Sequence, residues 1–115
     1  MQPKKKDLAY LWDILDAAKA VQAFTNQVTF KQYLKDRKLQ MAIERALEII
    51  GIAAKHVSEG FQADHAEIPW KKMIGLRNVL AHEYGEIRQE RIWAVVATNV
   101  PELIKQIETL VPGSP

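Results

Sequence analysis

With 115 residues, the chain is long enough for one domain with one modest core, and its 16 lysine and arginine residues nearly balance 14 aspartate and glutamate residues. The net charge of +2 is too small to indicate nucleic-acid binding by itself, and the lack of cysteine excludes disulfides and thiolate chemistry. No apolar run predicts a membrane span, and the basic residues 1–6 do not resemble a secretory signal. We therefore expect a single cytoplasmic domain over residues 1–115, with a frayed tail at residues 113–115.

The N-terminal part of the chain predicts one long helix and one short helix. Asp7 is placed to act as the N-cap of the first helix, and residues 26–28 have the composition of a turn. Thr29 then opens a short helical segment that carries Phe30 and Tyr33. The apolar stripe of the first helix recurs at steps of three and four residues and consists of Leu8, Leu11, Trp12, Leu15, Ala18 and Val21.

A wider apolar pattern follows the charged run at residues 35–38, which we expect to be a kink or a short loop. Its alternating steps of four and three residues predict a helix packed nearly parallel to a neighbour. A second apolar stripe widens the face, so a second copy of the chain is expected to pack there, and we predict a homodimer. The alternative is a central helix buried within one chain. The two stripes are Leu39, Ile43, Ala46, Ile50, Ala53 and Val57, and then Ala42, Ile49 and Ile52.

The C-terminal half predicts two further helical segments. Gly60 is expected to end the preceding helix, and residues 61–67 to form a polar loop. Pro69 stands where the first residue of a third helix belongs, and Gly85 is where that helix is expected to stop. In the last amphipathic segment, Pro101 either kinks the helix or starts a new one. No alternating strand pattern occurs, so the predicted fold class is all-α, an up-and-down bundle of four to five helices.

Arg77, His82 and Tyr84 stand close together at the end of the third predicted helix. Arg77 is seven residues after Trp70 and four after Met73, which places it on the apolar face. A cation on a core-facing stripe needs a partner, because burying an unpaired charge costs several kcal/mol. His82 lies about 140° further around a regular helix than Arg77. A straight helix therefore does not point both side chains the same way, whereas an unwound helix end or a two-fold axis beside the helix could bring them into one pocket.

An arginine and a histidine in one pocket suit phosphate chemistry. The guanidinium group matches phosphate oxygens, and the imidazole can take or give a proton near neutral pH. Together they suit RNA cleavage, in which the deprotonated 2′-hydroxyl attacks the adjacent phosphorus and the arginine stabilises the developing charge. No metal-ligand motif accompanies them, so we expect no metal or other cofactor. The structural alternative is that Arg77 pairs with Glu44 or Glu48, while His82 makes hydrogen bonds near a helix C-terminus.

Residues 77–84 (RNVLAHEY) resemble the signature of HepT-like proteins in the HEPN superfamily. That signature is an arginine, four to six residues, a histidine, one residue and a tyrosine. Residues 68–70 (IPW) and 74–76 (IGL) resemble the same family, as do residues 47–51 (LEIIG) in the second predicted helix. The likeness extends from the first predicted helix to Leu110.

The resemblance implies an all-α homodimer whose signature lines a cleft at the dimer interface. It implies a metal-independent ribonuclease toxin with RNA as its substrate, in which Arg77 and His82 are catalytic and Asn78 supports the cleft. It also implies a cognate antitoxin of the MntA type, a minimal nucleotidyltransferase. This antitoxin would transfer AMP from ATP onto Tyr84, which places a charged phosphodiester beside the catalytic pair and silences the toxin.

One position departs from the family pattern. Ile52 follows Gly51, where many relatives carry a glutamate. If that glutamate orients the arginine, then either Glu48 takes over this task or the activity is weaker. Two other functions stay open on the sequence. One is a non-catalytic subunit that binds a nucleotide or a nucleotidyltransferase in the same cleft, and the other is a structural dimerisation domain in which Arg77 pairs with Glu48.

Overall fold

The computed structural model describes residues 3–82 and 88–113 of the chain. Every regular element in these two ranges is helical and none is a strand, which confirms the all-α fold class. In chain order the elements are α1 (Lys5–Thr25), α2 (Phe30–Leu34), α3 (Arg37–His56), α4 (Glu59–Asp64), α5 (Trp70–His82), α6 (Gln89–Ala94), the π-helix η2 (Val95–Asn99) and α7 (Val100–Glu108).

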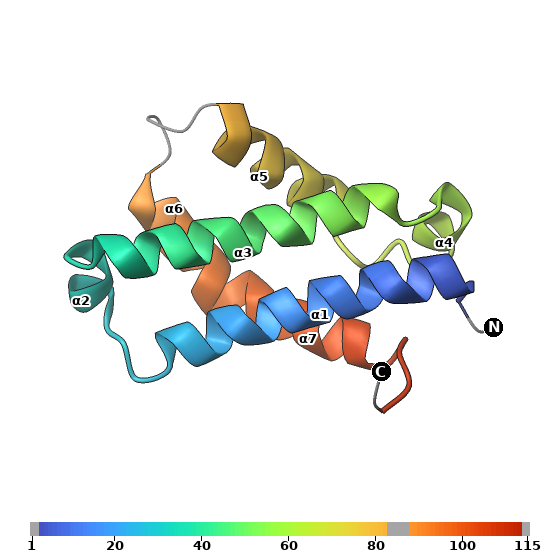
Figure 1. The fold of residues 1–115 in the computed structure, drawn as a ribbon, viewed down its shortest axis with the longest axis horizontal. Coiled ribbons are helices and arrows are strands. Elements are labelled where there is room, and N and C mark those ends of the chain that lie inside the picture. The colour runs from blue at the N-terminus through green and yellow to red at the C-terminus, as the bar shows by residue number, and fades with distance from the viewer. Residues whose placement is uncertain (1–2, 83–87, 114–115) are drawn as a thin grey trace.

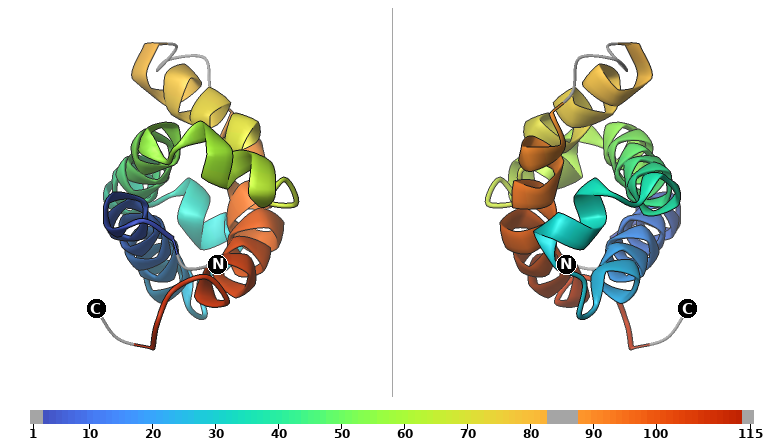
Figure 2. Two further views of the ribbon diagram at one scale, coloured as in Figure 1. Left: turned by 90° about the vertical axis from the view of Figure 1, so that its right-hand side faces the viewer. Right: turned by 90° about the vertical axis from the view of Figure 1, so that its left-hand side faces the viewer.

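Helix α3 occupies the centre of the bundle. It packs along α1 on one side and along α5 on the other, and α1 also packs against α7 (Figure 1). The core lies between these helices, and its fully buried side chains include Leu11, Ile14, Ile43 and Ile107. Helix α5 lies outermost, projecting from the ring formed by the other helices (Figure 2). Its main packing partner is α3, so the contact between α3 and α5 fixes the position of the residues that α5 carries.

The first turn of α1 differs from the prediction. The helix begins at Lys5, so Asp7 is not its N-cap but lies inside the first turn, where it is buried. The Asp7 carboxylate instead accepts hydrogen bonds from the backbone N–H of Ser58 at 2.9 Å and from its hydroxyl at 2.6 Å. The N-terminal end of a helix favours a negative charge, and these two bonds offset the loss of water around the carboxylate. Asp7 thereby ties α1 to the residue that precedes α4.

Side-chain caps define the ends of α2 and α3. Thr29 opens α2, as predicted, and exchanges hydrogen bonds with Gln32 in a capping box. Asp36 caps α3 by accepting from the backbone N–H of Leu39 at 3.0 Å. Of the charged run at residues 35–38, only Lys35 and Asp36 form the short connection between two helices, and Arg37 and Lys38 already belong to α3.

The connection between α3 and α5 is more ordered than the sequence indicated. Helix α3 ends at His56, so Gly60 does not end it, and the polar loop expected at residues 61–67 is largely replaced by α4. None of the α4 side chains is buried, so this short helix leaves no apolar pattern in the sequence. The side-chain amide of Gln62 holds α4 in place by donating to the backbone carbonyl groups of Ala54 and Val57 at the end of α3.

The prolines mark the starts of two helices. Helix α5 begins at Trp70, one residue later than predicted, and the Pro69 carbonyl accepts a hydrogen bond from the backbone N–H of Met73 at 3.1 Å. Pro101 lies in the first turn of α7, where its missing N–H costs little, and the wider turn of η2 precedes it. Of the two outcomes expected for Pro101, the structure has a new helix start. The stop predicted at Gly85 lies outside the described residues.

Within one chain, α1 and α5 cover much of the apolar face of α3. The first stripe is buried except for Leu39, which is half-buried, and the second stripe is half-buried throughout. Beside it, Met41 is 54% exposed. The homodimer expected from this face stays a prediction. None of the helices in the described ranges combines the length and the apolar character needed to cross a membrane.

Candidate functional site

Helix α5 carries the arginine and the histidine of the signature. It runs without interruption through His82, so Arg77 and His82 lie on one continuous helix. Arg77 is half-buried, whereas Asn78 and His82 are exposed. The unwound helix end considered above does not occur before His82, and within one chain the two side chains leave the helix in different directions. Tyr84 lies outside the residues that the structure describes.

Arg77 lies at a tight contact between α5 and α3. Its side-chain stem packs directly on Gly51 of α3: a β-carbon built on Gly51 would lie 2.2 Å from the Arg77 Cβ and 2.7 Å from the Met73 carbonyl oxygen. No real β-carbon tolerates such distances, so the two helices can cross at this separation only because residue 51 has no side chain. The prediction that Arg77 shares a face with Met73 agrees with this packing.

The guanidinium group of Arg77 is only partly satisfied. Its Nε atom is buried and has no hydrogen-bond partner among the described residues. One terminal nitrogen, Nη1, donates to the Asn78 side-chain oxygen at 3.3 Å. Neither acidic residue proposed as a structural partner is paired with Arg77: Glu48 binds Arg45 at 2.7 Å, and Glu44 binds Arg37 at 3.6 Å. Within the described ranges, the salt-bridge alternative for Arg77 is therefore wrong.

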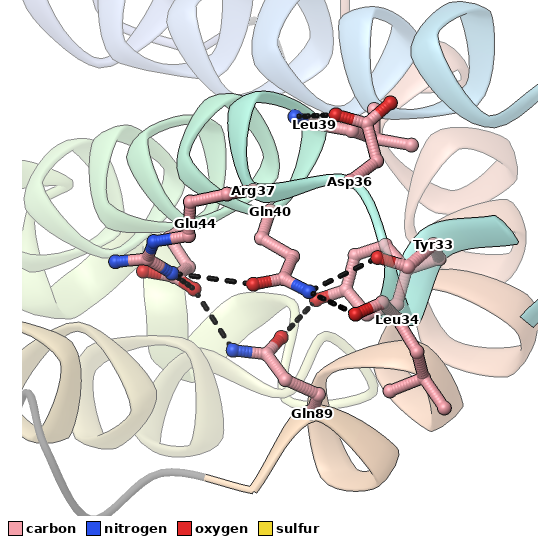
Figure 3. Close-up of polar contacts among 8 residues, drawn as sticks. All are labelled: Tyr33, Leu34, Asp36, Arg37, Leu39, Gln40, Glu44 and Gln89. Carbon is pink, nitrogen blue, oxygen red and sulfur yellow. Dashed lines mark hydrogen bonds and ion pairs between the residues drawn. The ribbon is translucent and has the colours of Figure 1, made fainter. Parts of the chain in front are cut away.

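Glu44 belongs to a cluster of polar side chains that joins α2, α3 and α6 (Figure 3). The buried Tyr33 hydroxyl donates to the Gln89 side-chain oxygen, and the Gln89 amide donates to the Glu44 carboxylate at 3.2 Å. On the other side, Arg37 contacts both Glu44 and Gln40, at 3.6 and 3.3 Å. The Gln40 amide donates in turn to the Tyr33 backbone carbonyl at 3.0 Å. The cluster fixes the start of α6 against the end of α3 that lies farthest from Gly51.

Burial and then the nearby Glu44 carboxylate raise the pKa of the Tyr33 hydroxyl above its ordinary value, while Arg37 acts in the opposite direction. Burial has this effect because it penalises the charged form of the side chain. The hydroxyl therefore keeps its proton at neutral pH and remains the donor in its bond to Gln89. Sequence reasoning missed this cluster, because its members come from three separate elements.

The second face of α5 borders a cavity of about 470 Å³ between this helix and the segment formed by η2 and α7. Gly75 and Val79 line it, and the cations Lys72 and Arg91 also contribute to its wall. Leu47 and Ile50 of α3 also line it, as does Met73, whose carbonyl oxygen lies at the contact with Gly51. Sequence reasoning did not single out Lys72 or Arg91, because no local motif contains them.

Taken from the residues upward, the site is a cation held rigidly against α3 and an exposed imidazole five positions further along α5. The cation can bind a phosphate oxygen through its terminal nitrogens, and the imidazole can exchange protons with solvent or a substrate. In the part of the chain that the structure describes, no three His, Asp or Glu side chains gather in a way that could hold a metal ion.

Comparisons with known proteins show which family the chain belongs to. The sequence profile of the HepT-like ribonuclease family matches residues 14–110. A candidate RNase of Methanocaldococcus jannaschii is 45% identical over 95% of this chain and 90% of its own length. A protein of Thermococcus cleftensis named probable ribonuclease HepT is 37% identical over 93% of this chain and 97% of its own length. A candidate RNase of Caldanaerobacter subterraneus is 35% identical over 88% of this chain and 90% of its own length.

No solved structure gives a significant match. The family match covers more than half of the chain, and the relatives align along almost their whole lengths. Together with the all-helical fold, this confirms the resemblance to HepT-like proteins of the HEPN superfamily that the sequence indicated. The chain belongs to the HepT-like ribonuclease family.

Proposed function

We propose that this chain is an RNA endonuclease that works without a metal ion, with Arg77 and His82 as its catalytic residues. The observation that carries the proposal is the state of Arg77. This cation is held in place by α3, yet its buried Nε–H has no partner among the described residues. A structural arginine would be expected to satisfy that donor, because a buried unpaired polar group destabilises the fold. The terminal nitrogens of the same guanidinium group, one of which reaches the exposed Asn78, are placed to bind a phosphate ligand.

The chemistry follows from the two side chains. The His82 imidazole takes the proton of an RNA 2′-hydroxyl, and the 2′-oxygen forms a bond to the adjacent phosphorus. The bond from phosphorus to the 5′-oxygen breaks, this leaving oxygen takes up a proton from water, and the His82 imidazolium returns its own proton to solvent. The products are a 2′,3′-cyclic phosphate and a 5′-hydroxyl end. The Arg77 guanidinium stabilises the negative charge that grows on the phosphoryl oxygens. Asn78 supports it by accepting from Nη1 at 3.3 Å.

The site is proposed to be completed by a second copy of the chain. Arg77 faces α3, while His82 is exposed and lies about 140° away around the same helix, so one copy does not direct both groups at one phosphate. A two-fold axis beside α5 would place two arginines and two histidines around one cleft. The half-buried outer stripe of α3 and the exposed Met41 offer apolar surface for such a contact.

The test is RNA cleavage by the purified protein in the presence of EDTA. His82→Ala and Arg77→Ala should each lower the cleavage rate about 100-fold or more, because one loses the proton acceptor and the other the charge stabilisation. The matched controls are His56→Ala, which removes an exposed histidine of α3, and Arg45→Ala, which removes an exposed arginine. Both controls should cleave at the wild-type rate. If the wild-type protein leaves RNA intact, the non-catalytic binding subunit becomes the better description.

We further propose that the protein is the toxin of a toxin–antitoxin pair in the cytoplasm, silenced by an MntA-type nucleotidyltransferase. In the silencing step, the Tyr84 hydroxyl oxygen attacks the α-phosphorus of ATP, and pyrophosphate leaves as the new oxygen–phosphorus bond forms. The added phosphodiester is negatively charged and stands two residues from His82 in the sequence. It would occupy Arg77 in place of an RNA phosphate, which stops cleavage.

Two experiments check this second proposal. Expression of the wild-type chain alone should arrest growth of the host cell, and His82→Ala should relieve the arrest. After coexpression with a nucleotidyltransferase of the MntA type, the intact mass should rise by one or more AMP units, and Tyr84→Phe should abolish the increase while Tyr10→Phe leaves it unchanged. An AMP adduct mapped to another residue would contradict the assignment of Tyr84.

A further inference from the structure

Gly51 differs from the other glycines that the structure describes. A β-carbon built on Gly60, Gly75 or Gly113 would meet no atom within 4 Å, whereas one on Gly51 would overlap the Arg77 stem and the Met73 carbonyl oxygen. Gly51 is also buried and stands inside a long helix, where glycine destabilises relative to alanine. A glycine at such a position needs a packing reason, and the contact with Arg77 supplies one.

The contact restricts how Arg77 can lie. The built β-carbon of Gly51 would be 2.2 Å from the Arg77 Cβ and 3.0 Å from its Cγ, so the first two side-chain carbons rest directly on the α3 backbone. The Nε–H follows after one further carbon, Cδ, and its nitrogen is buried. The packing of the Arg77 side-chain carbons on the α3 backbone at Gly51 thus excludes water from Nε. It leaves the terminal nitrogens further out, where Nη1 reaches Asn78.

We propose that Gly51 is a positioning residue for the reaction. By letting α5 lie against α3 at this separation, it holds the Arg77 guanidinium in one orientation, with the Nε–H kept dry and the terminal nitrogens directed outward to receive a phosphoryl oxygen. Gly51 touches no substrate and acts only through Arg77. The expected effect of Gly51 on catalysis rests on the proposed ribonuclease function. Its effect on the placement of Arg77 does not.

The kinetic test is Gly51→Ala, with Gly75→Ala as the matched control. Both variants add one methyl group to a helical glycine, but only the first meets neighbouring atoms. A displacement of Arg77 by roughly an ångström should lower kcat about 100-fold. The change in KM should be much smaller, because RNA binding draws on many phosphate contacts. Gly75→Ala should retain the wild-type kcat. If Gly51→Ala also retains it, the inference is overturned.

A second readout follows the arginine itself and needs no catalysis. In wild-type protein, the Arg77 Nε–H should give a separate ¹⁵N–¹H NMR signal that exchanges with water at least about 10-fold more slowly than that of the exposed Arg45. Arg77→Lys assigns the signal by removing it. Rapid exchange of the Arg77 signal in the wild type would overturn the inference even if Gly51→Ala proved unable to fold. In a folded Gly51→Ala protein, the signal should lose its protection, whereas Gly75→Ala should preserve it.

The two readouts separate this inference from the proposed function. If the wild-type protein cleaves no RNA but the Arg77 Nε–H is protected and Gly51→Ala removes that protection, the ribonuclease proposal fails and the placement of Arg77 by Gly51 stands. If the wild type cleaves RNA and Gly51→Ala leaves both the rate and the protection unchanged, the ribonuclease proposal stands and the role of Gly51 fails.

Discussion

Replacing Arg77 by methionine should make the protein more stable and inactive at the same time. Methionine keeps the Cβ and Cγ atoms that pack on Gly51, but it removes the buried Nε–H, which has no partner among the described residues. An unsatisfied buried donor costs about 1–3 kcal/mol, and the exposed bond to Asn78 that is lost contributes about 0.5 kcal/mol or less. The free energy of unfolding should therefore rise by about 1 kcal/mol.

The assay is urea unfolding at one fixed protein concentration, because the stability of the proposed homodimer would depend on concentration. In thermal melts at the same protein concentration, the melting temperature should rise by about 4 °C, and in RNA cleavage assays the rate should fall to background. Arg45→Met is the control: it breaks an exposed ion pair with Glu48, so stability should fall by about 0–1 kcal/mol and cleavage should continue. A loss of more than about 1 kcal/mol in Arg77→Met would refute the reasoning, since it would mean that the arginine has a structural partner.

Three further predictions concern stability. Asp7→Ala should lower the free energy of unfolding by about 2 kcal/mol in urea titrations, because it removes both bonds to Ser58; a loss below about 0.5 kcal/mol would contradict this role. Because burial raises the pKa of Tyr33, stability should be complete below the unfolded tyrosine pKa of about 10 and fall as pH rises above it, where the unfolded side chain ionises first. Between pH 8 and pH 11, the melting temperature of Tyr33→Phe should fall less than that of the wild type. An equal fall in both proteins would count against Tyr33 as the cause of the pH dependence. Gly60→Ala should raise the free energy of unfolding by about 0.5 kcal/mol in the same urea titrations, because its added methyl group meets open space. A lower free energy of unfolding in this variant would contradict the prediction.

The helices that could be predicted from the sequence are those with long apolar stripes. The stripes of α1 and α3 correspond to buried faces, and the step of seven residues from Trp70 to Arg77 correctly placed the arginine on the face toward α3. Helix α4 was missed because it buries no side chain, so it carries no periodic signal. The cap assigned to Asp7 was wrong because its partner, Ser58, is 51 positions away in the chain.

The candidate site could be predicted in part. The residue types and their spacing pointed to Arg77 and His82, because the chemistry of a phosphate ligand limits the choice of side chains. The partner of Arg77 could not be predicted, because a helical repeat shows which face is buried but not which residue of another helix meets it. An acidic partner was expected, and the structure instead has Gly51. A glycine in the middle of an apolar helix was the one available signal of that contact.

The identity of the RNA ends tests the central claim most directly. Wild-type protein is mixed with a short RNA in the presence of EDTA, and the products are identified by mass spectrometry. Metal-independent cleavage through the 2′-hydroxyl predicts fragments with 2′,3′-cyclic phosphate and 5′-hydroxyl ends, and no cleavage of the 2′-O-methyl form of the same RNA. Cleavage that EDTA abolishes, fragments with 5′-phosphate ends, or cleavage of the 2′-O-methyl substrate would contradict the mechanism assigned to Arg77 and His82.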